Sequence, residues 1–252
     1  IPYIAFGLWP VIMNRISRGQ KDKVTQFRKI TNASERIALD CLTASGWSVE
    51  GGIEYFFTNA HSKAAVPATN AKALEELYMR YKDPNDTMIL AEGVGQFCED
   101  LEVDPSDVVL LVVSWHMNAA TMCEFSREEF INGMASLGCD SIDKLKAVFG
   151  KLRDEMRDDT KFRDIYNYAF DFSREKGQKC LQLDTAVAMW QLIFSAHPWP
   201  LVDEWCEFLQ EHHNRAISKD TWTQLLDFIK SISPDFSNFD ENGAWPYLID
   251  EF

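Results

Sequence analysis

The chain has 252 residues, of which 46% are hydrophobic, and with eight Trp and 17 Phe it can build a sizeable core in one or two domains. Its 25 basic and 39 acidic residues give a net charge of −14. This balance excludes nucleic acid and anionic membranes as expected partners and favours a basic protein.

The cysteines have no CxxC pair and no neighbouring His at metal-ligand spacing. Most fall on the apolar side of predicted helices, which is typical of reduced core thiols in an intracellular protein. We therefore expect no metal site, no cofactor, and a location in the cytoplasm, the nucleus or both. The six residues are Cys41, Cys98, Cys123, Cys139, Cys180 and Cys206.

Residues 1–19 are expected to be an N-terminal extension outside the fold. The opening apolar run, residues 1–13, is too short to span a membrane, and no basic region precedes it as in a signal peptide. Met13, followed by Asn-Arg-Ile-Ser-Arg, has the pattern of a natural start. The first dozen residues are then upstream translation or the edge of a fragment.

Residues 20–60 have room for three short helices and nothing else. Their apolar stripes are Val24, Phe27 and Ile30; Ile37, Ala38, Cys41 and Leu42; and Ile53, Phe56 and Phe57. Ser34 and Ser48 are expected N-caps, and Gly46 ends the second helix. With Gly46-Trp47 in the turn before the third helix, this module resembles the ubiquitin-associated (UBA-like) domain. The resemblance implies weak binding of a ubiquitin-like protein, with packing or tethering as the alternative.

Residues 61–70 have the composition of a flexible linker, closed by Asn70 as an N-cap, and residues 71–252 form the larger domain. Every segment of this domain has a helical pattern and strand signals are absent. Asp104-Pro105 is expected to cap the helix from Val108 to Trp115, which is apolar nearly all round and therefore buried. Residues 125–130 have the clearest helix start, a capping box with a hydrophobic staple. The predicted fold class is all-α: a three-helix UBA-like bundle plus an EF-hand-like multi-helical domain.

Residues 83–94 lie between two helical stripes, as an EF-hand calcium loop would. Asp83 and Asn85 fit loop positions 1 and 3. Position 6 is Met88 instead of Gly, and position 12 is Val94 instead of a bidentate Glu. Without that Glu the loop loses two of about seven oxygen ligands. We predict the EF-hand-like shape without calcium, which argues against a calcium sensor.

The sequence contains no Gly-rich phosphate loop, no nucleophile elbow and no HExxH motif. His212 and His213 follow a helix, where a protonated His complements the helix dipole. No Cys has a sequence context that lowers a thiol pKa, although a thioester-forming ligase cysteine stays an open alternative. The chain is therefore expected not to be an enzyme.

The acidic C-terminal stretch, residues 218–252, has no Lys or Arg after Lys230. It belongs to a part of the chain, residues 63–252, that carries −16, against +2 for residues 1–62. Trp222, Leu225, Leu226 and Ile229 predict a helix capped by Ser218, with Asp220 in its first turn. A second helical pattern, Trp245, Leu248, Ile249 and Phe252, leaves Asp250 in water. The result is an acidic surface framed by aromatic residues.

These motifs together resemble the defective-in-cullin-neddylation (DCN1-like) family over residues 13–252. The segments that carry the resemblance, besides the two modules, are Phe125-Ser126-x-x-Glu129-Phe130, Leu137-Gly138-Cys139-Asp140-Ser141, Glu211-His212-His213, Lys219-Asp220-Thr221-Trp222 and Gly243-Ala244-Trp245-Pro246-x-Leu248-Ile249-Asp250. The larger domain, 71–252, would be the family's potentiating-neddylation domain.

The resemblance implies a scaffold ligase without catalytic residues of its own. Such a protein binds the C-terminal winged-helix subdomain of a cullin. It also binds the N-acetylated conjugating enzyme of the neddylation pathway. The family's acidic cullin-binding patch falls here on Asp220, Ala244 and Asp250. The alternative is a ubiquitin-binding adaptor that works mainly through the UBA-like domain, with ubiquitin or the cullin modifier as its ligand.

The resemblance also implies a hydrophobic pocket for the acetylated N-terminal Met of the conjugating enzyme. Acetylation removes a charge that would be costly to bury. Met122 stands where family members can carry Gln, which puts a side-chain hydrogen bond there in doubt. The residues that would line the pocket, each of which also fits a plain core position, are Val94, Leu110, Val113, Ser114, Met122, Cys123, Phe125, Phe172 and Leu192.

Overall fold

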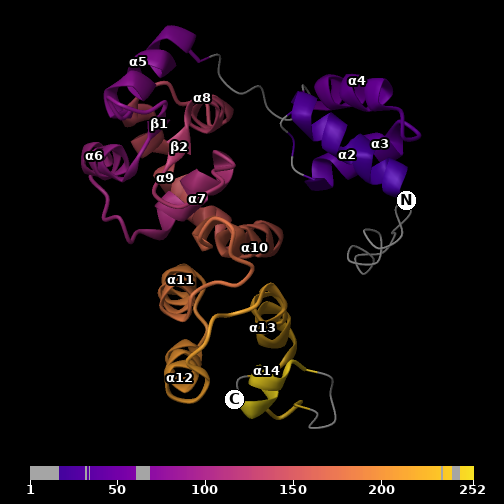
Figure 1. The fold of residues 1–252 in the computed structure, drawn as a ribbon, viewed down its shortest axis with the longest axis vertical. Coiled ribbons are helices and arrows are strands. Elements are labelled where there is room, and N and C mark those ends of the chain that lie inside the picture. Colours follow the sequence, from indigo (N-terminus) through magenta and orange to yellow (C-terminus); the bar gives the residue numbers. More distant parts are fainter. Residues whose placement is uncertain (1–16, 32, 34, 61–68, 234, 240–244) are drawn as a thin grey trace. The chain divides into compact units, whose positions relative to one another are not determined.

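The computed structural model describes residues 17–31, 33, 35–60, 69–233, 235–239 and 245–252 (Figure 1). The chain divides into two compact units, Ile1–Ala65 and Val66–Phe252. The predicted all-α class is confirmed, since nearly all regular structure of the described residues is helical. Residues 1–16 of the predicted extension and residues 61–68 of the predicted linker lie outside the described part.

The first unit is a three-helix bundle, and its helices are α2 (Arg18–Thr31), α3 (Glu35–Ala44) and α4 (Val49–Ala60). Phe27 and Leu42 are fully buried at its centre. Gly46 and Trp47 both have positive φ, 63° and 64°, and make the tight turn between α3 and α4. Ile30 differs from the prediction: it is 55% exposed, because the small core extends along α2 only as far as Phe27.

The second unit begins with an EF-hand-like half and continues with a C-terminal half. The first half contains α5 (Ala71–Tyr81), β1 (Met88–Ile89), α6 (Ala91–Leu101), α7 (Val108–His116), β2 (Phe125–Ser126), α8 (Arg127–Ser136) and α9 (Ile142–Glu155). The rest contains α10 (Asp159–Ser173), α11 (Leu183–Ala196), α12 (Val202–Phe208), the π-helical turn η1 (Leu209–His213), α13 (Lys219–Ser231) and α14 (Tyr247–Glu251). Helix α10 joins the halves, because it packs on α7 and also on α11 and α13 (Figure 1).

Two short strands correct the expectation that strands are absent. Met88 pairs with Ser126 and Ile89 with Phe125 in an antiparallel ladder between the two helix–loop–helix units. A strand of two residues is too short to show a period of two in sequence, so the pattern could not reveal it. Its pairing partner also lies about forty residues away along the chain.

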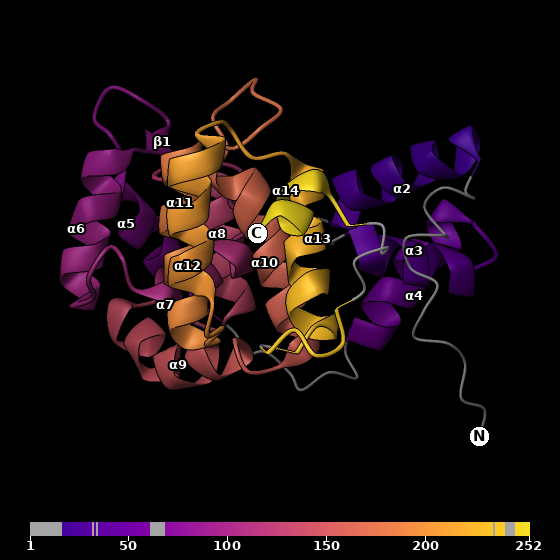
Figure 2. The ribbon, with the colours of Figure 1, turned by 90° about the horizontal axis from the view of Figure 1, so that it is seen from below.

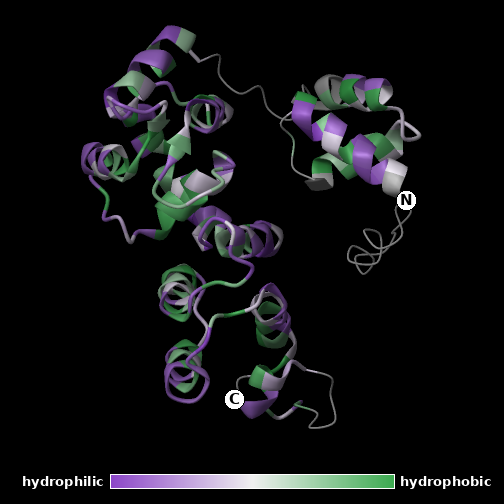
Figure 3. Ribbon diagram, viewed as in Figure 1, coloured by the Kyte–Doolittle hydropathy of each residue, from purple (hydrophilic) through white to green (hydrophobic). Residues whose placement is uncertain are grey.

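Helix α7 is the buried centre of the first half. Of its first seven residues all but Leu110 are buried, in agreement with its continuous apolar sequence (Figure 3). Its N-cap is Asp107, whose side chain accepts from the Val109 amide, whereas the predicted Asp104-Pro105 forms the preceding turn with Ser106. No helix of the described residues is long and apolar enough to cross a membrane.

Two glycines allow helices to approach closely. A Cβ on Gly93 of α6 would lie 2.0 Å from the Tyr81 carbonyl oxygen at the end of α5. A Cβ on Gly133 of α8 would lie 2.3 Å from Cγ of Met117, just after α7. Any larger residue would therefore force neighbouring backbones apart.

A hydrogen-bonded aromatic cluster, Tyr166, Trp190 and Trp222, joins α10, α11 and α13. The Trp222 ring stacks on Tyr166 and on Trp190, with centroids 4.8 Å apart in both cases. Trp190 Nε1 donates to the Tyr166 hydroxyl, which donates to the Trp222 carbonyl, and Trp222 Nε1 donates to the Tyr166 carbonyl, each over 2.9 Å. All three residues are fully buried, so every polar group in the cluster needs its partner.

Replacing Tyr166 by Phe removes one hydroxyl that both accepts and donates. It leaves the buried Trp190 indole without an acceptor, so we expect the free energy of unfolding to fall by about 1–3 kcal/mol. Urea denaturation followed by tryptophan fluorescence measures this. Tyr247→Phe, which removes an exposed hydroxyl, is the control and should change stability by less than about 0.5 kcal/mol. Equal midpoints for the two variants would contradict the role of the cluster.

Candidate functional site

The N-terminus of α13 is built as the sequence predicts. The Ser218 hydroxyl accepts from the Thr221 amide over 3.0 Å and caps the helix. Asp220 lies in the first turn, where a carboxylate complements the helix dipole. Its side chain is exposed and accepts one hydrogen bond, from Gln224 Nε2 over 3.0 Å. Asp220 is therefore fixed on the helix and still has acceptor capacity facing solvent.

Lys219, the neighbour that could neutralise Asp220, is engaged elsewhere. Its Nζ lies 2.5 Å from Oδ2 of Asp171, near the C-terminal end of α10. Asp171 also pairs with Arg174, the residue that follows α10. These pairs tie the end of α10 to the start of α13 and leave the carboxylate of Asp220 available to a partner.

Helix α14 packs on α13 and presents the second predicted carboxylate (Figures 1 and 2). Ile249 is buried, and the preceding Trp245 meets the edge of Phe228 at 5.4 Å. Asp250, the next residue of this short helix, is exposed. Ala244, the third predicted residue of the patch, lies outside the described residues. The two described members thus occupy neighbouring, aromatic-anchored helices.

The residues of the predicted acetyl-Met pocket fall into two groups by exposure. Val113, Ser114, Phe125 and Phe172 are at most 7% exposed, as core residues would be. Val94 on α6, Leu110 on α7 and Leu192 on α11 are half-buried, and Met122 and Cys123 are exposed. Only the second group has side chains that are accessible to a ligand.

The loop before β2 is held against α10 at the predicted pocket. The Met122 amide donates to the Phe172 carbonyl over 2.9 Å. Phe172 stacks on Tyr168, whose hydroxyl donates to the Ala119 carbonyl over 2.9 Å. Cys123 has a left-handed backbone with φ of 63°, which turns the chain sharply between the exposed loop and the strand. Two of the nine residues of the predicted acetyl-Met pocket, Met122 and Phe172, are thus joined by a backbone hydrogen bond.

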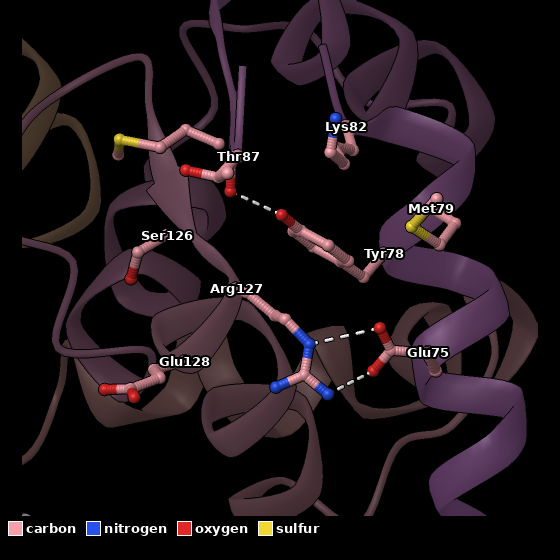
Figure 4. A pocket seen from close by; sticks show the side chains of 9 residues that line it. Glu75, Tyr78, Met79, Lys82, Thr87, Ser126, Arg127 and Glu128 are labelled. Carbon is pink, nitrogen blue, oxygen red and sulfur yellow. Dashed lines mark hydrogen bonds and ion pairs between the residues drawn. The ribbon is translucent and has the colours of Figure 1, made fainter. Parts of the chain in front are cut away.

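The structure contains a different pocket that the sequence did not reveal (Figure 4). It lies between α5 and the start of α8, next to the two-stranded sheet, and has a volume of about 530 Å³. Arg127 pairs with Glu75 on one side, and the Tyr78 hydroxyl donates to the Thr87 carbonyl. None of the nine predicted acetyl-Met residues lines it. Its residues are Glu75, Tyr78, Met79, Lys82, Thr87, Met88, Ser126, Arg127 and Glu128.

Oxygen atoms of the EF-hand-like loop accept hydrogen bonds from amides of the same loop. The Asp83 carboxylate accepts from the Asn85 amide over 2.7 Å, and the Asp83 amide donates to the Met88 carbonyl. Within the described residues, no group of three His, Cys, Asp or Glu side chains could hold a metal ion.

The cysteines follow the predicted pattern in part. Cys41, Cys98, Cys139 and Cys206 are buried, as expected, and Cys180 is half-buried. Cys123 is exposed, so the interpretation as a core thiol is wrong there. Its place in a loop rather than on a helix face explains the difference.

Comparisons with known proteins agree with this architecture. Residues 144–252 match the family described as Cullin binding, and residues 21–62 match the UBA-like domain. DCN1-like protein 3 of Homo sapiens is 42% identical over 195 residues, which are 76% of this chain and 64% of that protein. DCN1-like protein 5 of Bos taurus is 36% identical over 218 residues, which are 83% of this chain and 91% of that protein.

The chain belongs to the DCN1-like family. It spans 64% of the length of DCN1-like protein 3. In this DCN1-like chain, the stretch that matches the Cullin binding family contains the whole predicted acidic patch, whereas most of the predicted pocket precedes it.

Hydrogen bonds to the buried Glu155 fix His116 at the end of α7, two residues after Ser114 of the predicted acetyl-Met pocket. Glu155 at the end of α9 is 7% exposed, and its oxygens lie 2.8 Å from Nε2 of His116 and 2.7 Å from Nζ of Lys161 on α10. Burial by itself would raise the pKa of the Glu155 carboxyl. The hydrogen bonds from His116 and Lys161 outweigh that effect and hold the pKa below its ordinary value.

Since the pKa of Glu155 is lower in the folded state than in the unfolded state, its contribution to stability is present above the ordinary glutamate pKa. That contribution is lost as the pH falls through the lowered value. We expect Glu155→Gln to unfold at less urea than wild type at neutral pH, with a gap that narrows towards acid. Urea midpoints between pH 7 and pH 3 test this, with Glu175→Gln, at an exposed carboxylate, as the control. A gap that stays constant over this range would contradict it.

Proposed function

We propose that this protein is a non-catalytic scaffold ligase that promotes cullin neddylation. Its DCN1-like family membership and its match to the Cullin binding family over residues 144–252 support this function. The observation that carries the proposal is that Asp220 and Asp250 lie inside that match and are exposed on adjoining helices.

The acidic patch, defined as Asp220, Ala244 and Asp250, would bind the winged-helix subdomain of a cullin. Two exposed carboxylates offer charge-assisted hydrogen bonds to Lys or Arg, and Ala244 is a small residue that would not obstruct a partner. The net charge of −16 over residues 63–252 would also steer a basic partner towards this unit.

The predicted pocket around α7 would bind the acetylated N-terminal Met of the conjugating enzyme. Half-buried Val94, Leu110 and Leu192 supply an apolar environment, and Met122 is flexible enough to adapt to a Met side chain. Holding both proteins turns an encounter between separate molecules into a nearly intramolecular reaction. The scaffold would then accelerate transfer through proximity and orientation alone.

The chemistry of three buried thiols supports a role without a thioester. Burial raises the pKa of the thiols of Cys98, Cys139 and Cys206, the last to about 11. A nucleophilic cysteine needs the opposite shift, because the thiolate is the reactive form.

The ubiquitin-adaptor alternative rests on the UBA-like unit, which matches the UBA-like domain over residues 21–62 and exposes Ile30 on α2. An adaptor would lose its function when this unit is deleted. The scaffold proposal instead assigns the essential contacts to residues 71–252, which have a core of their own.

The direct test is the affinity of the full chain for a cullin winged-helix subdomain, measured by calorimetry at low and high salt. We expect binding that weakens with salt and is lost in Asp220→Ala/Ala244→Arg/Asp250→Ala. Asp235→Ala, at another exposed carboxylate of the same stretch, is the matched control. If the triple variant binds as tightly as wild type, the cullin-binding site lies elsewhere on the chain. If the wild-type chain binds no cullin, the ubiquitin-adaptor alternative is favoured.

Cys123 offers a second test, for the pocket. An acetylated N-terminal peptide of the conjugating enzyme should slow alkylation of Cys123 by iodoacetamide, read by mass spectrometry, because the bound Met covers this exposed thiol. The same peptide without the acetyl group should protect much less, since its ammonium would have to be buried. Leu192→Arg should abolish protection. Equal protection by both peptides would argue against an acetyl-Met pocket.

A further inference from the structure

Helix α14 has two faces of opposite character. Ile249 is 2% exposed, and Leu248 and Phe252 pack partly buried beside it on the hydrophobic core. Tyr247, Asp250 and Glu251 are exposed and, at spacings of three and four residues, lie on one side of the helix. An aromatic ring and two carboxylates therefore share the outer face of α14.

Tyr247 is the most exposed large hydrophobic side chain of the described residues, at 72%. Its ring is held in place, because its hydroxyl donates a hydrogen bond to the Glu251 carboxylate one turn later. That carboxylate raises the pKa of the Tyr247 phenol, so the tyrosine stays a neutral donor at physiological pH. Nothing within the described part of this chain packs on the ring enough to bury it.

The charge around the ring selects the kind of partner. No Lys or Arg occurs in residues 231–252, so the chain itself supplies no cation from this stretch. Asp250 and the tethered Glu251 are both negative and lie on the same face as the ring. A Lys or Arg side chain placed over Tyr247 would meet the negative face of the ring and a carboxylate together.

We propose that Tyr247 is a specificity-determining contact for the cullin: an aromatic platform on which one Lys or Arg side chain of the winged-helix subdomain stacks while Asp250 or Glu251 pairs with it. This inference rests on the proposed scaffold function and extends the acidic patch beyond Asp220, Ala244 and Asp250. The surface is continuous with that patch, because Tyr247 and Asp250 are three residues apart on one helix. Exposed tyrosine is also a residue type that concentrates binding energy at interfaces.

The test measures binding of the full-length chain to a cullin winged-helix subdomain by calorimetry, with three substitutions at Tyr247. Tyr247→Ala should weaken binding by about tenfold, because it removes the ring. Tyr247→Phe keeps the ring and should stay within about threefold of wild type, having lost only the tether to Glu251. Tyr247→Leu keeps apolar area without the aromatic face and should resemble Tyr247→Ala.

Met79→Ala is the matched control, since Met79 is 57% exposed on α5, remote in sequence from the patch, and should leave affinity unchanged. Thermal unfolding should be the same for all these variants. Wild-type affinity in Tyr247→Ala or Tyr247→Leu, while Asp220→Ala/Asp250→Ala loses binding, would overturn this inference and leave the scaffold function intact. If the wild-type chain binds no cullin subdomain, the scaffold function fails and this inference fails with it.

Discussion

The stacking of Trp222 between Tyr166 and Trp190 is the interaction on which the C-terminal half depends. It fixes α13 against α10 and α11 through two ring contacts and two buried hydrogen bonds to Tyr166, and a third hydrogen bond joins Trp190 to Tyr166. Trp222 stands two residues after Asp220, so the same core contact that stabilises the fold also positions the exposed carboxylate. Helix α14 then packs on α13 and brings Asp250 and Tyr247 to the adjoining surface.

The distribution of charge complements this arrangement. Two cations close to the start of α13, Lys219 and Arg174, are both paired with Asp171. Deeper in the unit, the buried Glu155 is satisfied by His116 and Lys161, side chains from two different helices. The acidic excess is consequently left on the C-terminal surface, where it is hydrated and available, and where a basic partner would replace water at little desolvation cost.

The sequence determined the features that depend on local physics. Side-chain caps at Asn70, Ser126 and Ser218 follow from short-range hydrogen bonding, and the structure shows all three. The residues of α7 are apolar on nearly every side of the helix, which predicted its burial, and helical periodicity predicted the all-α class. Charge counting alone located the acidic surface, because residues 231–252 contain acids and no bases. The family motifs then pointed to the same residues.

Only the tertiary structure decided features that need two distant segments. The pairing of β1 with β2 joins dipeptides that carry no strand pattern, and the pocket between α5 and α8 exists only where those helices meet. The exposure of Cys123 follows from a left-handed turn that its neighbours in sequence do not specify. Local sequence fixes what a segment is, whereas packing between segments fixes which side of it meets water.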